Sequence, residues 1–190
     1  MEDSVRWRGS LAHKGHAASV VGQGWTGHAL PLPEDTPLSV LPAQVTGPLA
    51  FTVVGVWTQP EPSDVEHLLR GIDALRPHLP EGPLVVMGDF NSNTRWDRPG
   101  TPQKNHARLV QTLAEEFGLH SAYHYVHGVE HGQERHPTHY FQFREDQPFH
   151  IDYVFVPREW ADRLTRVDVG TFEDWPTSDH RPLLVELDLP

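Results

Sequence analysis

The sequence predicts an α+β layered domain, and three observations support this prediction. Short runs of β-branched and aromatic residues, typical of buried strands, recur along the chain. Two longer stretches place apolar residues at helical spacing. Further strand-like runs follow one another toward the end of the chain. Because 190 residues is the length of an ordinary domain, we expect a single domain over residues 1–190.

The first part of the chain has the weaker patterns. Residues 1–30 are rich in Gly and His, and an apolar run at 17–22 predicts one short strand. Prolines recur through residues 31–48, at Pro31, Pro33, Pro37, Pro42 and Pro48. Because proline has no backbone N–H and fixes its own φ, we expect an extended, irregular surface connection over 31–48.

From residue 50 the pattern becomes clear. Ala50–Trp57 reads AFTVVGVW, which predicts a buried strand. Ser63 or Asp64 can cap a helix that continues to about Leu79. Pro83–Gly88 (PLVVMG) then predicts a second buried strand, which ends directly before an aspartate.

The second half predicts one more helix and a series of strands. Residues 105–117 carry leucine, valine and phenylalanine on one helical face, and Gly118 is a stop signal. Four strands are expected, at Thr138–Phe143, His150–Val156, Val167–Thr171 and Leu183–Leu189. Strands on both sides of two amphipathic helices indicate the layered α+β arrangement.

Composition excludes several classes of function. The chain has no Cys, which excludes a disulfide scaffold, a thiolate nucleophile and a Cys-ligated zinc or iron–sulfur site. A net charge of −11 disfavours a non-specific nucleic-acid coat protein but permits an enzyme that meets phosphate through a metal ion. Without a long apolar run or a signal-peptide pattern, we expect no membrane span and a cytoplasmic location.

The first of three polar motifs is Gly88–Asn93, GDFNSN. It directly follows a predicted strand, so Asp89 and Asn91 are expected at the rim of the sheet. An aspartate there can bind a hard cation or take a proton from water, and an asparagine can orient the nucleophile. An ordinary Asx turn is the other interpretation of this motif.

The other two motifs lie near later strands. Along His150–Val156 the alternation places His150 and Asp152 on one face, which indicates either a functional pair or an edge strand with a wet face. Ser178–Pro182 joins Asp179 to His180 just before a strand. This pair combines a metal ligand with a phosphate-binding or acid–base group.

In this order, the three motifs resemble those of the endonuclease/exonuclease/phosphatase superfamily. The resemblance covers about residues 50–190 and is anchored by GDFNSN, HIDYVF and SDHRP. It is closest to a bacterial branch that shares Val56–Gln59 (VWTQ) and His136–Thr138 (HPT). The resemblance implies an α/β (α+β) fold, a four-layer sandwich of two mixed β-sheets flanked by helices. We expect the N-terminal strands of that fold to be lacking.

The resemblance also implies a divalent-metal-dependent phosphoesterase that hydrolyses phosphodiester bonds through a metal-assisted water. The implied cofactor is Mg²⁺ or Mn²⁺. By motif, Asp89 would activate the water and Asn91 would position it. Asp179, together with Asp89, would bind the metal. His180 would contact the scissile phosphate, and Asp152 would hold the His180 ring.

We expect the substrate to meet the segment that follows the GDFN loop. This segment is the most basic window of the chain, and Trp96 beside Arg95 can stack on a base or pack in the core. The substrate-binding candidates are Asn93, Arg95, Trp96 and His150. DNA and RNA are the leading partners, with nucleotide, lipid and inositol phosphates left open because the reacting group is the same.

Two further interpretations remain. The first is a truncated, catalytically weak family member that binds nucleic acid or nucleotides without turnover. The second concerns a histidine-rich stretch, with His120, His124, His127, His131, His136 and His139. A three-histidine zinc site would suit these ligands, but glycine and proline interrupt the spacing, so we expect solvated loop histidines. We expect His124, His136 and His139 to line the substrate cleft.

Overall fold

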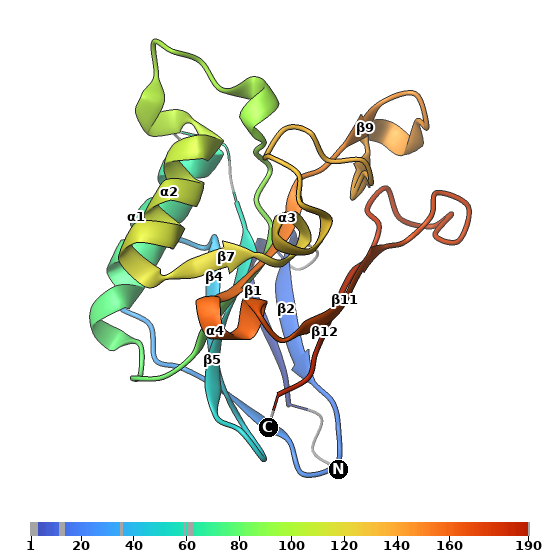
Figure 1. Cartoon of the computed structure of the whole chain (residues 1–190). Helices are drawn as coiled ribbons and strands as arrows, with labels where there is room; N and C mark the ends of the chain where they lie inside the picture. Colours follow the sequence, from blue (N-terminus) through green and yellow to red (C-terminus); the bar gives the residue numbers. More distant parts are fainter. Residues whose placement is uncertain (1–3, 12–13, 35, 59, 61–62, 190) are drawn as a thin grey trace. The chain divides into compact units, whose positions relative to one another are not determined.

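The computed structural model describes residues 4–11, 14–34, 36–58, 60 and 63–189 (Figure 1). The chain divides into two compact units, Met1–Phe90 and Asn91–Pro190. None of the helices in the described part of the chain has the length and hydrophobicity that a transmembrane helix needs.

The first unit contains a hairpin and a mixed sheet. Strands β1 (Ser4–Leu11) and β2 (Lys14–Val20) pair antiparallel in the hairpin. The sheet has the order β3 (Thr26–Ala29), β4 (Val40–Thr46), β5 (Phe51–Trp57) and β6 (Leu84–Asp89). The first three of these strands are antiparallel, and β5 and β6 run parallel.

Helix α1 (Asp64–Leu75) confirms the predicted helix after Ser63 and connects the two parallel strands. It ends at Leu75, before the expected Leu79, and a short 3₁₀ turn, η1 (Arg76–His78), follows it. Ser63 caps the helix, because its Oγ accepts a hydrogen bond of 3.2 Å from the Glu66 backbone N–H. The apolar face buries Leu68 and Ile72. The strand predictions for 50–57 and 83–88 are also confirmed.

The prediction of an irregular connection over 31–48 is wrong, because β4 occupies Val40–Thr46. Pro42 is tolerated inside this strand for a geometric reason. Its carbonyl accepts a hydrogen bond of 3.1 Å from the Leu30 N–H, at the end of β3. Since the N–H and C=O of one residue point to the same neighbouring strand, the missing donor leaves the β4–β5 ladder intact.

The second unit contains three short antiparallel pairs. These are β7 (Leu119–Ser121) with β10 (Asp152–Pro157), β8 (His139–Tyr140) with β9 (Pro148–Phe149), and β11 (Leu164–Val169) with β12 (Leu183–Leu187). Its helices are α2 (His106–Phe117), α3 (Ala122–His127) and α4 (Arg158–Ala161). The 3₁₀ turns are η2 (Thr94–Trp96), η3 (Pro102–Lys104) and η4 (Phe141–Phe143).

Several boundaries in this unit differ from the predicted ones. The strand expected at 138–143 is reduced to His139–Tyr140, because Gln142 and Phe143 have φ values of 53° and 59° and turn the chain. The strand expected from His150 begins at Asp152. Its interpretation as an edge strand with a wet face is wrong, since Val154 and Val156 are buried. Strands and helices combine in both units, which confirms the α/β fold class.

Candidate functional site

The Asp152–His180 pair stands at the start of β10. His180 Nδ1 lies 3.0 Å from Asp152 Oδ2 and 3.2 Å from Oδ1. Thr138 Oγ1 accepts the backbone N–H groups of Ile151 and Asp152, each at 3.0 Å, and so fixes the strand end. A carboxylate facing Nδ1 selects the tautomer that carries its proton there, which leaves Nε2 for other partners.

Asp179 and His139 lie directly beside this pair. His139 Nε2 is 3.5 Å from Asp179 Oδ2, and the His139 and His180 rings are 4.6 Å apart. Backbone bonds hold the two segments together, including Tyr140 N–H to the Asp179 carbonyl at 2.7 Å. His139, Asp179 and His180 each offer a ligand atom within 4.8 Å of the others, which makes this group a candidate site for a divalent cation.

The buried side chain of Arg181 supports the loop that carries Asp179 and His180. Its side chain is 3% exposed and lies between the Tyr140 and Phe172 rings, at 4.9 and 4.8 Å. Nη1 donates to the carbonyls of Ser178 at 2.6 Å and His180 at 2.9 Å. The loop that carries Asp179 and His180 is therefore folded around its own arginine.

Asp89 and Asn91 fall on either side of the boundary between the units. Asp89 ends β6 in register with Trp57, and its carbonyl accepts the Thr58 N–H at 3.1 Å. Gly88 before it has φ 137°, and a Cβ there would lie 2.1 Å from the Val56 carbonyl oxygen. Asn91 has φ 46°, a left-handed conformation that asparagine tolerates. The catalytic roles of Asp89 and Asn91 stay predictions.

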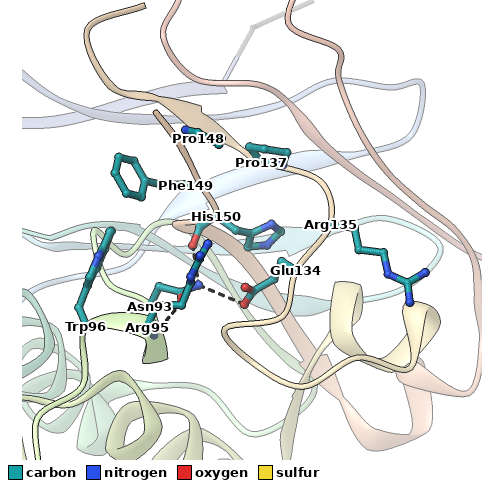
Figure 2. Close-up of a pocket in the computed structure, with 9 residues that line it drawn as sticks. All are labelled: Asn93, Arg95, Trp96, Glu134, Arg135, Pro137, Pro148, Phe149 and His150. Carbon is teal, nitrogen blue, oxygen red and sulfur yellow. Dashed lines mark hydrogen bonds between the residues drawn. The ribbon is translucent and has the colours of Figure 1, made fainter. Parts of the chain in front are cut away.

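A pocket of about 160 Å³ brings together the predicted substrate-binding residues (Figure 2). Its lining consists of Asn93, Arg95, Trp96, Glu134, Arg135, Pro137, Pro148, Phe149 and His150. The Trp96 and Phe149 rings are 5.2 Å apart and inclined by 56°, and Trp96 is 47% exposed. Trp96 thus packs on Phe149 with one part of its ring exposed, and stacking on a base stays a prediction.

Asn93 is an organiser of the pocket wall. Its side chain is buried, and Nδ2 donates to Glu134 Oε1 at 3.1 Å, the His150 carbonyl at 3.0 Å and the Tyr153 hydroxyl at 3.0 Å. Its Oδ1 accepts the Arg95 N–H at 3.0 Å and caps η2. Every polar atom of the Asn93 amide therefore has a partner, and its substrate-binding role stays a prediction.

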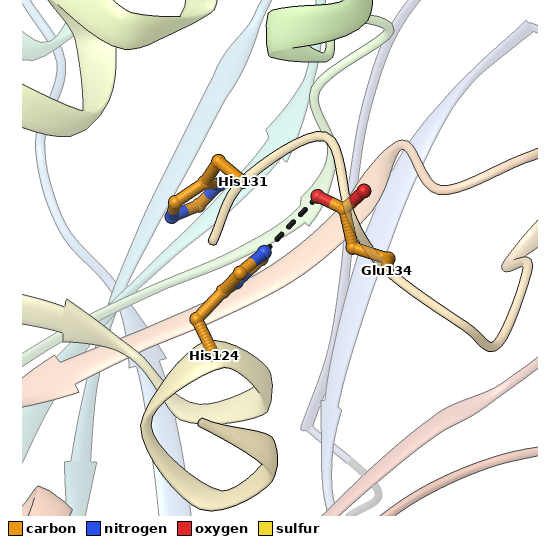
Figure 3. Close-up of side chains that lie close together, drawn as sticks. All are labelled: His124, His131 and Glu134. Carbon is orange, nitrogen blue, oxygen red and sulfur yellow. Dashed lines mark hydrogen bonds and ion pairs between the residues drawn. The ribbon is translucent and has the colours of Figure 1, made fainter. Parts of the chain in front are cut away.

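A half-buried cluster of His124, His131 and Glu134 shares its glutamate with the pocket lining (Figure 3). His124 Nε2 is 3.0 Å from Glu134 Oε1, and its Nδ1 is 2.7 Å from Ser121 Oγ. The His131 ring stacks on the His124 ring with a centroid distance of 3.5 Å and an interplanar angle of 15°. His131 Nδ1 in turn lies 3.3 Å from His106 Nε2. The expectation of solvated loop histidines is wrong for His124 and His131, because the His124 side chain is 9% exposed and the half-buried His131 ring stacks on it.

Burial sets the charges of this cluster. It lowers the pKa of His106 to about 3 and that of His131 to about 2, so both rings are neutral near pH 7. Burial opposes ionisation of Glu134, but hydrogen bonds from His124, Gly132 and Asn93 outweigh it and lower the Glu134 pKa to about 2. Nothing in the sequence distinguishes Glu134 from a surface glutamate, since its partners come from distant positions.

His150 has one satisfied and one unsatisfied ring nitrogen. Its Nδ1 donates to the His136 carbonyl at 2.7 Å, while its buried Nε2 has no hydrogen-bond partner among the described residues. Burial lowers the pKa of His150, so Nε2 presents a lone pair. Of the histidines expected at the cleft, His124 binds the pocket residue Glu134, and His136 binds Tyr123 at 2.8 Å.

Several solved structures have a similar fold, and their names describe phosphatases and endonucleases. A 3′ phosphatase, NExo, from Neisseria bound to a product DNA hairpin matches with 22% identity, a TM-score of 0.64, and coverage of 97% of this chain and 79% of that one. An AP endonuclease from Archaeoglobus fulgidus matches with 16% identity, a TM-score of 0.67 and the same coverage. The endonuclease domain of TRAS1, a telomere-specific non-LTR retrotransposon, matches with 21% identity, a TM-score of 0.66, and coverage of 97% and 80%.

These likenesses show the fold. No curated protein matches the chain. The model of the Endonuclease/Exonuclease/phosphatase family matches residues 17–180, which is most of the sequence. The chain therefore belongs to the endonuclease/exonuclease/phosphatase family, whose members are hydrolases that act on phosphate esters.

Proposed function

We propose that this protein hydrolyses phosphodiester bonds in nucleic acids, with DNA as the leading substrate, and depends on a divalent metal ion. The observation that supports this most directly is the Asp152–His180 pair with Asp179 beside it. Support for DNA comes from the similar structures, one of which holds a product DNA hairpin. The cytoplasmic location and the single-domain organisation stay predictions.

His180 is the proposed phosphate-contacting group. With Nδ1 turned to Asp152, its Nε2 can donate a hydrogen bond to a phosphate oxygen or a proton to the leaving oxygen. The Asp152 carboxylate stabilises the protonated ring, and a cation at this place offsets the negative charge of the transition state. Asp152 thus acts through His180 by fixing its orientation and charge.

Asp179 and Asp89 are the proposed metal-binding carboxylates. The donors of the second unit fit a divalent cation, since Asp179 is 39% exposed and lies within reach of ring nitrogens of His139 and His180. Mg²⁺ prefers oxygen ligands and Mn²⁺ tolerates an added imidazole. A bound cation would neutralise phosphate charge and make a water molecule more acidic.

Asp89 and Asn91 are included in the proposal because they belong to the GDFN motif. Asp89 would accept the proton of the attacking water, and Asn91 would orient that water or a phosphate oxygen. The position of Asp89 at the last residue of β6 supports this role, because a strand end holds a carboxylate firmly at the sheet rim.

The decisive measurement is hydrolysis of bis(p-nitrophenyl) phosphate and of a DNA oligonucleotide with Mg²⁺ or Mn²⁺. We expect Asp152→Asn and His180→Ala to lower kcat by about 10²–10⁴-fold, the usual contribution of an acid–base group. Asp146→Asn is the matched control, since this exposed aspartate pairs with Arg144. Wild-type rates in both test variants would refute the role assignment. DNA binding without hydrolysis under either metal would favour the non-catalytic alternative.

A further inference from the structure

We propose that His124, His131 and Glu134 form a second metal site, suited to a borderline transition-metal ion such as Zn²⁺. The three residues come from helix α3 and the loop that follows it, and Figure 3 shows them grouped. Each offers one ligand atom, and these atoms lie within 4.8 Å of one another. The group shares no residue with His139, Asp179 and His180.

The donor set selects the metal. Two imidazoles and one carboxylate are a ligand set of known zinc sites, whereas Mg²⁺ prefers oxygen donors and keeps its waters. His124 Nε2 and Glu134 Oε1 are 3.0 Å apart. Two atoms at that separation, each about 2.1 Å from one ion, subtend an angle of about 90° at the metal, which zinc accepts.

Outer contacts hold each of the three side chains. Ser121 Oγ holds Nδ1 of His124 at 2.7 Å, which leaves Nε2 for the site. His106 holds one ring nitrogen of His131 at 3.3 Å. Glu134 Oε1 also accepts the Asn93 amide at 3.1 Å and the Gly132 N–H at 2.9 Å. Such outer-shell contacts fix tautomer and direction in established metal sites.

A second, independent observation is the orphaned nitrogen of His150. Its side chain is 5% exposed, its ring centroid lies 6.0 Å from that of His124, and its Nε2 has no hydrogen-bond partner among the described residues. A buried lone pair without a donor is costly. A cation bound by the cluster compensates it electrostatically.

Binding requires one local movement. An imidazole binds a metal near its own ring plane, and the His124 and His131 rings are stacked nearly parallel. The His131 ring therefore has to turn out of the stack. This is a rotation of one side chain in a loop, and it predicts that metal binding changes the environment of His131 more than that of His124.

The experiment uses the untagged full chain, stripped with a chelator, and titrates Zn²⁺ by calorimetry and Co²⁺ by visible absorption. A His139→Ala background removes the other candidate group. We expect that background to bind about one equivalent of Zn²⁺ that excess Mg²⁺ does not displace. Adding His131→Ala or Glu134→Gln should weaken binding by more than about 100-fold, and Ser121→Ala by about 10-fold.

Two controls separate a metal site from a structural network. His78→Ala removes an exposed histidine and should leave zinc affinity unchanged. Glu134→Gln keeps the shape and the acceptor oxygen, so circular dichroism should show the same fold while metal binding is lost. No zinc binding in the His139→Ala protein would overturn the proposal. Undiminished binding after adding His131→Ala would overturn it equally.

Discussion

Histidine occupies three different environments in this chain, and each gives the ring a different chemistry. His180 faces the Asp152 carboxylate at 3.0 Å through Nδ1. For His106 and His131 desolvation outweighs the nearby Glu134 carboxylate, so their pKa values fall to about 3 and about 2. His78 lies exposed on the surface. Burial and partners, not residue type, decide which histidine can act on phosphate.

A substitution of the single residue Trp96 tests whether the pocket binds a base. We expect Trp96→Ala to raise KM for a single-stranded DNA oligonucleotide by about 10-fold, since base stacking on an aromatic ring contributes about 1–3 kcal/mol. The kcat for bis(p-nitrophenyl) phosphate should stay unchanged, because that substrate has no base. Phe143→Ala is the control, as Phe143 is similarly exposed and lies outside the pocket lining. Equal KM values for wild type and Trp96→Ala would exclude stacking.

Gly88 provides a test of the strand that ends at Asp89. We expect Gly88→Ala to lower the free energy of unfolding by more than about 2 kcal/mol, because its Cβ would collide with the Val56 carbonyl and its φ of 137° disfavours any side chain. Urea denaturation measures this loss. Gly82→Ala, with φ 129° and open space around it, isolates the backbone strain from the collision. A smaller loss at position 88 than at 82 would contradict the explanation.

At the scale of elements, the start of α2 depends on one side chain from a distant turn. Asp97 accepts the N–H groups of His106 at 2.7 Å and Ala107 at 3.0 Å, one on each carboxylate oxygen. We expect Asp97→Ala to cost about 1–2 kcal/mol of unfolding free energy, as loss of a helix cap does. Asp97→Asn retains one acceptor and should cost about half as much. Equal stability of all three proteins in urea would show that water replaces the cap.

Elements with a clear apolar pattern were predictable. The runs at Ala50–Trp57 and Pro83–Gly88 and the amphipathic stretch after Ser63 appear close to their expected bounds. The sequence does not predict strand β4, because prolines in general disfavour a strand. Pro42 is tolerated there because the side of the strand without its N–H faces the end of β3. Helix α3 was missed because six residues are too few to show a period.

The candidate site divides in the same way. Motifs identified Asp152 and His180, and the structure brings the two together. The sequence does not indicate a role for Glu134 or for the cluster around His124. These residues are brought together by contacts that involve positions 93, 106, 131 and 150, which are far apart in the sequence. Such contacts form only when the loop after α3 folds back, and no local pattern records that.

At the scale of the whole molecule, the buried histidines predict how stability depends on pH. An unfolded histidine takes up a proton near pH 6.5, whereas His106 and His131 stay neutral in the folded state to about pH 3 and pH 2. The stability that these two neutral rings contribute to the folded state is therefore fully present above pH 6.5 and is lost as the pH falls. We expect the unfolding free energy to drop by on the order of 1 kcal/mol per pH unit for each histidine below pH 6.

Urea midpoints at pH 7.5, 6.0 and 5.0 measure this trend. Glu134 adds a loss of the same sign below about pH 4.5, because its folded pKa of about 2 lies under the ordinary value of 4.5. His106→Gln should give a shallower slope, and His78→Gln should leave the slope as it is. Midpoints that stay constant from pH 7.5 to 5.0 would show that the buried rings are already charged or exposed.

The buried guanidinium of Arg181 has a consequence for the approach of substrate. A chain with a net charge of −11 repels a polyanion at a distance. Arg181 makes no ion pair with the described carboxylates, and its contacts are with carbonyl groups and aromatic faces. Its positive charge therefore lies behind the His180 loop, close to the carboxylates of Asp152 and Asp179 but not in a direct ion pair with either. An anion close to that loop meets the positive charge of Arg181 as well as the carboxylates of Asp152 and Asp179, so it is repelled less there than it would be if the buried cation were absent.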